Sequence, residues 1–484
     1  MKQKPELILP AGDPEKARFA FEYGADAVYL GLGKYSMRKT EVKYTITEIG
    51  QTIKLAHKLG KCVYITFNIF AHEEHLKNLA NDVKKIAKLG PDAFVVADMG
   101  VLNIVRDNAP KIPIHISTQQ NTVNAEAVKF WRKLGVKRVI LARELSLKEI
   151  AKIHKAVPDM ELEMFVHGAM CISYSGRCLL SAYMTGREAN LGDCAQPCRW
   201  QYKIHNSVIP DSIRNPEFID MDPRVKPEDD KGNNAPSVIP AKAGIQSSFY
   251  LEEKLRPGQF YPIEETENGT YLMNSKDLCL IEHLDEIRKT GITGLKVEGR
   301  NKSIYYLGTV ARAYRQALDL PLRHPEPSPR HPERKRRISE LKKELETLNH
   351  RGYTTGFALG KAKKGETFPS RQPIRTYNFV AVIRPLPRHS EQSEESHGIL
   401  RANALEDDTW WNFIEVRNQI KVGDMIEIIT PDKVTREKVL GILDESGKEI
   451  AIVNPGKTSQ MAYLKLKNTY PEMTLMRKKL KTTH

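Results

Sequence analysis

The sequence has no run of about eighteen apolar residues, the length that a helix needs to cross a membrane, so we expect no membrane-spanning segment. It also lacks a signal-peptide core, because the apolar stretch within Met1–Leu9 is short and interrupted by charge. These two absences predict a cytoplasmic protein. Cysteine is scarce, with six in 484 residues. So few in a long cytoplasmic chain argue against a disulfide framework and for metal or redox chemistry.

Acidic residues are too few to balance the basic ones. Asp and Glu number 60 against 75 Lys and Arg, which gives a formal net charge of +15. This excess favours a polyanionic partner, with RNA as the leading candidate and a merely basic soluble protein as the alternative. The hydrophobic content of 40% supports a real core, and the length allows a large catalytic domain with a smaller one.

Short apolar runs recur through the first three hundred residues, separated by amphipathic stretches of helical length. Eight strands with helices between them predict an α/β fold, a (β/α)8 TIM-like barrel. A doubly wound sheet is the alternative, although Gly31 and Gly33 do not complete a dinucleotide-binding fingerprint. The runs are Leu7–Gly12, Ala27–Leu32, Cys62–Phe70, Ala93–Met99, Ile112–Ser117, Arg138–Ala142, Leu162–Val166 and Gly294–Val297.

Polar residues gather where these runs end, and the carboxyl ends of the strands carry the chemistry of such barrels. For any single residue a capping or surface role is as reasonable as a catalytic one, but their recurrence at equivalent positions favours a site. The residues are Asp98, Gln119, Gln120, Arg143, Glu144, His167, Lys296, Glu298 and Arg300.

The connection between the seventh and eighth runs is too long for an ordinary crossover. We assign the barrel domain to residues 1–345, with an insertion after strand 7 whose cysteine-rich segment spans residues 163–202. Residues 207–247 repeat a Ser-Val-Ile-Pro sequence and resemble a translated palindromic genomic repeat. Residues 323–337 and 387–401 have a similar low-complexity character, so we expect all three stretches to be mobile surface loops without catalytic duty.

The sequence becomes rich in β pattern after about residue 370. Residues 370–484 therefore predict a small C-terminal β-barrel module, in which we expect a basic tail at the end of the chain. Such a module can bind RNA backbone, and a role in dimerisation or packing is the alternative. The basic tail contains Arg477, Lys478, Lys479 and Lys481.

Four cysteines, Cys171, Cys178, Cys194 and Cys198, lie in a loop rich in Gly, Ser and Arg. Thiolates suit iron–sulfur clusters or zinc, and the gap between the first two is wider than the pairs of structural zinc sites. This spacing favours an iron–sulfur cluster, while zinc and unligated thiols stay open. Cys62 fits a buried strand position, whereas Cys279, which opens an apparent helix, is a core residue or a reserve ligand.

Several motifs together resemble the signature of the collagenase-type peptidase family U32. The resemblance covers nearly the whole chain except the three insert-like stretches, and its cysteine motif is highly specific. The matching segments are Leu9–Gly12, Gly24–Tyr29, Glu163–Cys171, Ser175–Ser181, Gly192–Trp200, Asn274–Leu278 and Lys296–Arg300.

The resemblance implies a [4Fe–4S] cluster held by four cysteines and oxygen-independent hydroxylation with prephenate as the oxygen donor. The barrel with a short β module looks most like the branch that converts wobble uridine 34 of tRNA into 5-hydroxyuridine. Hydroxylation of 23S ribosomal RNA and a ubiquinone-hydroxylase subunit are the alternatives within the family. Its members differ in their fourth cysteine, so Cys171, Cys178 and Cys194 are carried over more safely than Cys198.

Two alternatives lie outside hydroxylation. An RNA-binding protein with a structural metal site predicts that cysteine variants unfold. A peptidase is disfavoured, because the sequence contains neither Gly-x-Ser-x-Gly nor His-Glu-x-x-His, and His72 and His75 are three residues apart instead of four.

Arg143 and Arg300 are our candidates for binding the two carboxylates of prephenate, since the guanidinium fork matches a carboxylate. A salt bridge at the barrel rim, with Glu144 or Glu298, is the competing interpretation. His167 is a candidate for proton transfer and Glu298 for a further catalytic role.

We also expect substrate contacts from three residues. Gln119 and Gln120 could read the edges of an unpaired uracil by hydrogen bonds. Asp98 is the third candidate. The oligomeric state is left open.

Overall fold

The computed structural model describes residues 4–36, 44–191, 193–199, 249–252, 260–263, 265–266, 269–270, 274–321, 330–360, 373–386, 410–456 and 460–480. The chain divides into two compact units, of which the second comprises residues 198–274 and 369–371. The insert-like stretches 207–247 and 387–401 lie outside the described residues, and their mobility stays a prediction. No helix in the described part of the chain is both long and apolar enough to span a bilayer.

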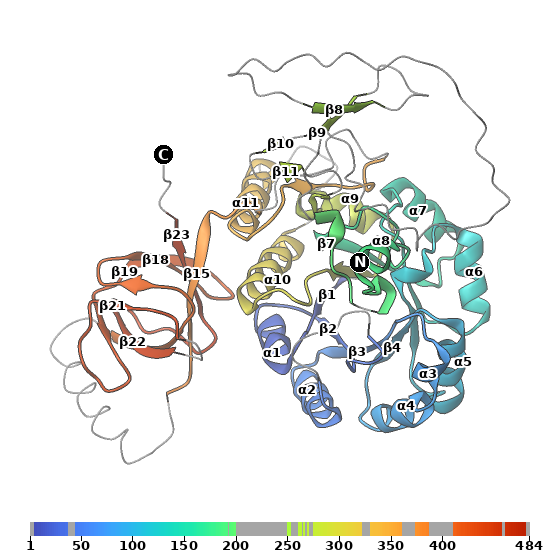
Figure 1. Cartoon of the computed structure of the whole chain (residues 1–484), viewed down its shortest axis with the longest axis horizontal. Helices are drawn as coiled ribbons and strands as arrows, with labels where there is room; N and C mark the ends of the chain where they lie inside the picture. The colour runs from blue at the N-terminus through green and yellow to red at the C-terminus, as the bar shows by residue number, and fades with distance from the viewer. Residues whose placement is uncertain are drawn as a thin grey trace, which may run out of the picture. The chain divides into compact units, whose positions relative to one another are not determined.

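Eight parallel strands form a closed barrel (Figure 1). Strand β13 pairs with β1 on one side and with β7 on the other, which closes the ring. This closure confirms the predicted TIM-like barrel and excludes a doubly wound sheet, which would leave two open edges. The strands are β1 (Glu6–Pro10), β2 (Ala27–Leu30), β3 (Cys62–Phe67), β4 (Ala93–Val96), β5 (Ile114–Ile116), β6 (Arg138–Ile140), β7 (Glu161–Ala169) and β13 (Gly294–Val297).

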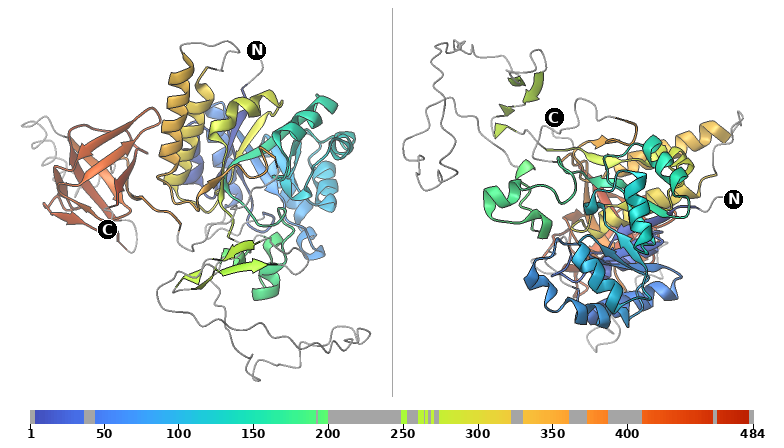
Figure 2. Two further views of the ribbon diagram at one scale, coloured as in Figure 1. Left: turned by 90° about the horizontal axis from the view of Figure 1, so that it is seen from above. Right: turned by 90° about the vertical axis from the view of Figure 1, so that its right-hand side faces the viewer.

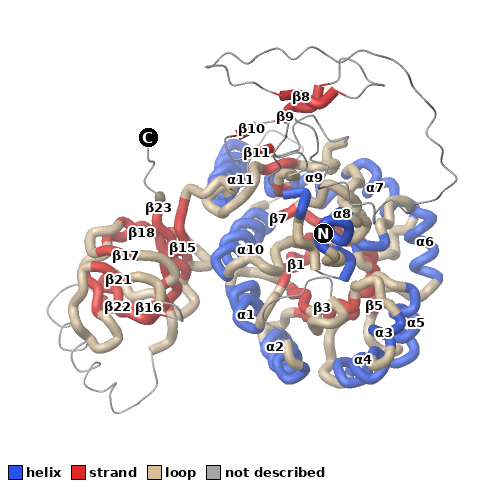
Figure 3. The backbone as a smooth tube through the Cα atoms, in the orientation of Figure 1, coloured by secondary structure: helices blue, strands red, loops and turns tan. Residues whose placement is uncertain are grey.

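Helices cover the outside of the barrel (Figure 3). Helix α1 begins as the sequence predicts: the Asp13 carboxylate accepts a hydrogen bond of 2.8 Å from the Lys16 amide, with a proline in the first turn. Capping boxes begin α2 and α7. The helices are α1 (Pro14–Glu22), α2 (Ile46–Lys58), α3 (Glu73–Leu76), α4 (Leu79–Ala87), α5 (Met99–Asn108), α6 (Ala125–Lys133), α7 (Leu147–Ala156), α9 (Leu284–Lys289) and α10 (Ile304–Asp319).

Two short strands extend the sheet beyond β7. Strand β12 (Asp277–Cys279) runs antiparallel to the end of β7, and β14 (Tyr353–Thr354) pairs with β12. Cys279 therefore lies in a strand and not at the start of a helix. Its side chain is buried, its sulfur is 4.0 Å from the Tyr314 hydroxyl, and burial raises the pKa of the thiol to about 11. These features are those of a core residue.

The prediction of a loop at residues 323–337 is wrong for its second half, because helix α11 (Arg330–Leu345) begins there. Two of its arginines tie it to neighbouring elements. Arg334 forms a salt bridge of 2.6 Å with Asp285, and Arg337 donates a hydrogen bond of 2.8 Å to the Gln316 side chain of α10. Helices α10 and α11 lie side by side (Figure 2). Tertiary ion pairs thus stabilise a helix whose composition alone resembled low complexity.

The C-terminal module is an antiparallel sheet of seven described strands, with its own hydrophobic core. Its two end strands do not pair within the described residues, so the predicted β-barrel module is a half-barrel. The strands in sheet order are β19 (Val434–Lys438), β18 (Met425–Ile429), β23 (Leu475–Lys479), β15 (Tyr377–Ile383), β16 (Trp410–Val416), β22 (Gln460–Leu466) and β20 (Gly441–Leu443).

The predicted basic tail is wrong, because its first three basic residues belong to β23, inside the sheet. Arg477 is only 4% exposed; it donates hydrogen bonds of 2.7 Å to Glu427 and 2.6 Å to Thr347. Lys478 pairs with Asp424 at 2.7 Å. Acidic partners neutralise Arg477 and Lys478, so these two residues do not form a free polyanion-binding surface.

A buried network of charges fills the inside of the barrel. The fully buried Glu163 carboxylate accepts a hydrogen bond of 2.7 Å from Lys296 and lies 3.3 Å from Arg138. Arg138 also pairs with Glu6 at 2.6 Å and with Glu161 at 2.8 Å. Burial raises the pKa of Glu6, although the charge of Arg138 opposes this. Each buried charge thus has a partner that offsets its lost hydration.

We predict that Glu163→Ala strongly destabilises the barrel, because it leaves the Lys296 ammonium buried without its carboxylate. Removing one partner of a buried ion pair costs about 3–5 kcal/mol. Urea unfolding followed by tryptophan fluorescence measures the change. Glu126→Ala is the matched control, since this carboxylate is exposed in its pair with Lys129, and its loss should leave the urea midpoint close to that of the wild type. Equal midpoints for the two variants would contradict the prediction.

Candidate functional site

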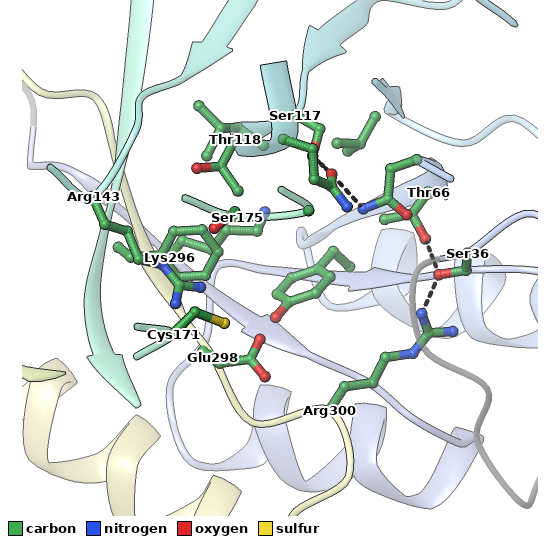
Figure 4. A pocket seen from close by; sticks show the side chains of 17 residues that line it. Ser36, Thr66, Ser117, Thr118, Arg143, Cys171, Ser175, Lys296, Glu298 and Arg300 are labelled. Carbon is green, nitrogen blue, oxygen red and sulfur yellow. Dashed lines mark hydrogen bonds between the residues drawn. The ribbon is translucent and has the colours of Figure 1, made fainter. Parts of the chain in front are cut away.

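A cavity opens at the carboxyl-terminal mouth of the barrel (Figure 4). Its empty volume is about 750 Å³, including the open side. The inward positions of the strands form its walls, among them Thr66 of β3, Phe165 of β7 and Lys296 of β13. The site therefore lies where the sequence predicts it.

Arg143 follows β6 and lines this cavity. Its guanidinium donates a hydrogen bond of 2.8 Å to the Ala169 carbonyl and lies 3.9 Å from the centre of the Phe165 ring. The buried Nε has no hydrogen-bond partner, and no carboxylate among the described residues lies within 4.0 Å of the guanidinium. The predicted rim salt bridge with Glu144 or Glu298 is thus not formed at Arg143, and this cation keeps hydrogen-bonding capacity for an anion.

Arg300 lies at the edge of the same cavity and is almost fully buried. It donates hydrogen bonds to the Ser36 hydroxyl and, at 3.2 Å, to the Gly31 carbonyl. Ser36 is in turn 2.8 Å from the Thr66 hydroxyl. A Cβ at Gly31 would overlap the Thr66 and Ser36 side chains, so only glycine fits where the arginine is held.

Two further charged residues line the cavity. The Lys296 ammonium, held by Glu163, lies 4.1 Å from the centre of the Tyr29 ring. Glu298, two residues on, is buried at 6% exposure and lines the cavity as well. In Figure 4 Arg143 and Arg300 lie on opposite sides of the cavity, with Cys171 and Glu298 between them in that view. The lining therefore carries three cations and one carboxylate.

The structure separates the two adjacent glutamines. Gln119 lines the cavity, and its side-chain oxygen accepts hydrogen bonds from Asn68, at 3.2 Å, and from Ser117. Gln120 does not line it; its amide donates to the Ala97 carbonyl. Asp98 is the N-cap of α5 and accepts a hydrogen bond of 3.0 Å from the Val101 amide. Gln119 is thus placed to contact a substrate, whereas Gln120 and Asp98 have structural partners outside the lining.

His167 lies outside the barrel cavity. A bulge in the pairing of β7 with β13 places it opposite Val297, so its ring turns outward, whereas Phe165 turns inward. The ring packs against Tyr306, Tyr314 and other aromatic side chains and lines a separate small cavity. Burial lowers its pKa to about 3. This placement does not support the predicted proton transfer at the mouth.

The cysteine-rich segment contributes one thiol to the cavity, that of Cys171. Cys178 is half-buried and Cys194 is exposed, and Cys198 belongs to the second unit. Cys171, Cys178 and Cys194 are free thiols, and the Cys194 sulfur accepts a hydrogen bond of 3.4 Å from the Gln196 amide. Within the described residues no three His, Cys, Asp or Glu side chains are gathered into a metal site. The Cys171, Cys178 and Cys194 thiols, with a backbone N–H···S contact at Cys194, have the donor chemistry of iron–sulfur ligands.

Sequence reasoning missed several residues that line the cavity. Tyr29 and Thr66 lie at inward positions of predicted strands, and the alternation of faces could have identified them. Ser36, Asn68 and Ser175 lie in loops, and only the closure of the barrel brings them to the mouth. Ser175 begins the Ser175–Ser181 motif, whereas no pattern in the sequence marks Ser36 or Asn68.

His167 predicts a measurable pH dependence of stability. Its pKa is about 3 in the folded protein, against the ordinary histidine value of 6.5, so between these values the unfolded chain binds a proton that the folded chain does not. Stability from this group is complete above about pH 6.5 and declines as the pH falls towards 3, by about 2 kcal/mol at pH 5. In urea unfolding, His167→Gln should lose less stability than the wild type between about pH 7 and about pH 5. The exposed His57→Gln is the control; equal pH slopes in all three proteins would refute this role.

Comparisons with known proteins point to the same family as the motifs of the sequence. Residues 12–367 match the family model described as Peptidase family U32, and residues 398–477 match the Peptidase family U32 C-terminal domain. The tRNA hydroxylation protein P of Escherichia coli is 39% identical over 88% of this chain and 86% of the relative. The protein of the same name from Haemophilus influenzae is 36% identical over 92% of this chain and 90% of the relative.

A third relative has a different substrate in its name. It is a 23S rRNA 5-hydroxycytidine synthase of Escherichia coli, 30% identical over 75% of this chain but only 46% of the relative. The family models together cover the barrel, the cysteine-rich segment and the C-terminal module. This chain belongs to peptidase family U32.

Proposed function

We propose that the protein hydroxylates tRNA and converts wobble uridine 34 into 5-hydroxyuridine. In this proposal prephenate donates the oxygen and a [4Fe–4S] cluster is bound by Cys171, Cys178, Cys194 and Cys198. One observation carries the proposal: a thiol of the cysteine-rich segment lines the same cavity as three cationic side chains. A redox cofactor and an acidic co-substrate could therefore meet at one mouth.

The charge of the cavity supports an anionic co-substrate. Arg143 keeps a buried Nε without a partner, and Arg300 lies on the other side of the cavity in the view of Figure 4, with its guanidinium turned toward Ser36. Two guanidinium groups on opposite sides match a molecule with two carboxylates, because each can bind a carboxylate through two N–H groups. A peptide substrate, which is neutral along its backbone, would not need this arrangement.

Several side chains would hold a bound base and donor in place. Gln119 presents an amide whose oxygen is fixed by Asn68 and Ser117, so its NH2 group is the part left to donate to a uracil oxygen. Glu298 lies beside the cations and could accept a proton in the reaction. An iron–sulfur cluster bound by the cysteines would supply the redox chemistry that uridine C5 requires. An anticodon base is unpaired and can enter such a cavity at little cost.

The choice of tRNA over ribosomal RNA rests on the domain plan. This chain spans 86–90% of the two relatives named tRNA hydroxylation protein P, and these have lengths close to its own. It spans less than half of the relative named for 23S rRNA, so that protein has a large part without a counterpart here. The barrel with one half-barrel module thus favours tRNA as the substrate.

Replacing either arginine should weaken the use of the acidic donor. We expect Arg143→Ala and Arg300→Ala each to lower the 5-hydroxyuridine content of tRNA at least tenfold, since a charged hydrogen bond is worth about 1.5–3 kcal/mol. The measurement is nucleoside analysis of tRNA from a deletion strain that expresses each variant.

The matched control is Arg132→Ala, which removes an exposed arginine of α6 that pairs with Asp159. It should leave modification at the wild-type level. Full modification by Arg143→Ala with normal expression would remove this residue from the proposed donor site.

The cluster is tested separately by anaerobic purification. We expect about four irons and four sulfides per chain with a visible absorption band, and their loss in Cys171→Ser. Cys279→Ser is the control, because this buried thiol packs in β12 and should leave the iron content unchanged. Stoichiometric zinc without a chromophore would instead favour a structural metal site.

A further inference from the structure

The segment that follows Cys171 exposes unusually large apolar side chains. Tyr183 is 90% exposed and Leu179 is 79% exposed, and three further side chains of the segment are also open to solvent. A soluble protein leaves a single apolar residue exposed without consequence, but five within the thirteen residues from Ile172 to Met184 mark a contact surface. The five residues are Ile172, Tyr174, Leu179, Tyr183 and Met184.

The outward direction of this face is fixed by the structure beneath it. Helix α8 (Leu180–Thr185) is anchored through Ser181, which is fully buried and whose hydroxyl accepts a hydrogen bond of 2.9 Å from the Ala195 amide. The Tyr183 amide donates to the Leu179 carbonyl, so these two residues lie one turn apart on the same side of the helix. Ser181, two positions from each, faces the opposite side.

The same segment reaches the rim of the cavity. Ser175 and Gly176 line the cavity, and Tyr174 and Arg177 flank them in a turn closed by a hydrogen bond of 3.0 Å. The Arg177 guanidinium lies 5.3 Å from the centre of the Phe70 ring. A molecule that inserts one end into the cavity would therefore pass Tyr174 and Arg177.

The charge of the segment distinguishes between possible partners. Residues 171–187 contain two arginines and no acidic residue; Arg187 is paired with Asp193 at 2.9 Å, so Arg177 supplies the positive charge of the segment. Tyrosines beside arginines are typical of surfaces that bind single-stranded nucleic acid, because rings stack on bases and guanidinium groups pair with phosphates. The chain as a whole carries a net charge of +15, which also favours a polyanion.

We propose that Tyr174, Leu179 and Tyr183 form a stacking face for unpaired nucleotides that adjoin the nucleotide in the cavity, and that Arg177 contacts their phosphates. The inference rests on the proposed function, since it takes RNA as the substrate. It adds the surface that holds the RNA loop while one base is inserted. The face lies on the same segment as the cysteines, so RNA binding and the cofactor would share one support.

The test is binding of a fluorescent anticodon stem-loop RNA to the full-length protein under anaerobic conditions. We expect Tyr183→Ala to weaken binding between about fivefold and a hundredfold, the range of one base–aromatic stack. Tyr183→Phe keeps the ring and should bind within about twofold of the wild type. Arg177→Ala should lower the dependence of binding on salt by about one phosphate contact, whereas Tyr183→Ala should leave that dependence unchanged.

Phe130→Ala is the matched control, because it removes a half-exposed aromatic ring from α6 on the outside of the barrel. It should bind RNA like the wild type. Iron content and the urea midpoint of each variant must equal those of the wild type, so that a loss of RNA binding cannot arise from a damaged cluster or fold.

Three results would overturn the inference. If the wild type binds and hydroxylates the RNA while Tyr183→Ala binds equally well, the stacking face is wrong and the proposed function stands. A change in sedimentation instead of RNA affinity in Tyr183→Ala would show that the face meets protein. If the wild type itself neither binds nor modifies tRNA, the proposed function fails together with this inference.

Discussion

The carboxylate of Glu163 is the charge around which the barrel is arranged. It has no contact with solvent and joins Lys296 of β13 to Arg138 of β6, the strands on either side of its own strand β7. Gly294 leaves the space it needs, since a Cβ there would lie 3.0 Å from the Glu163 side chain. A buried carboxylate without these partners would cost several kcal/mol, so the pairing of β7 with β13 and the position of the Lys296 ammonium stabilise each other.

The bulge between β7 and β13 then decides which side chains reach the mouth. Before it, Phe165 and Lys296 point inward in register; after it, His167 lies opposite Val297 and turns outward. One extra residue in the ladder thus moves a histidine out of the cavity and into an aromatic pocket. The burial that lowers its pKa follows from the same shift of register.

The sequence predicts the barrel well because strong local signals agree with the fold. Each of the eight apolar runs overlaps a strand, and the Asp13 side chain caps α1 as the sequence predicts. It fails where tertiary contacts replace local pattern. Strand β23 has two apolar residues followed by three basic ones, and its position between β18 and β15 is set by pairing with distant strands. Arg334 and Arg337 of α11 likewise need partners on other helices.

The candidate site also divides into features that local sequence predicts and features that tertiary structure decides. A polar residue after a strand is easy to find, but the sequence cannot say whether it points into the barrel. Gln119 and Gln120 are neighbours, yet a 3-10 turn sends one into the cavity and the other to the Ala97 carbonyl. Asp98 carries the same signal as Arg143 and is used as a helix cap. The backbone conformation of each loop sets the direction of its side chains, and patterns in a single sequence do not encode that conformation.

The charges at the mouth also constrain how two substrates could share it. Three cations and one carboxylate line the cavity, and the Glu163 carboxylate behind Lys296 offsets one of the cations. A uracil base is neutral and gains little from the remaining positive charge, whereas a donor with two carboxylates matches it. The amide of Gln119, held by Asn68 and Ser117, is suited to a neutral base instead. In the proposed reaction, the cavity therefore offers its cationic side chains to the acidic donor and the Gln119 amide to the base. The order in which the two bind would follow from which of these two walls lies deeper in the cavity.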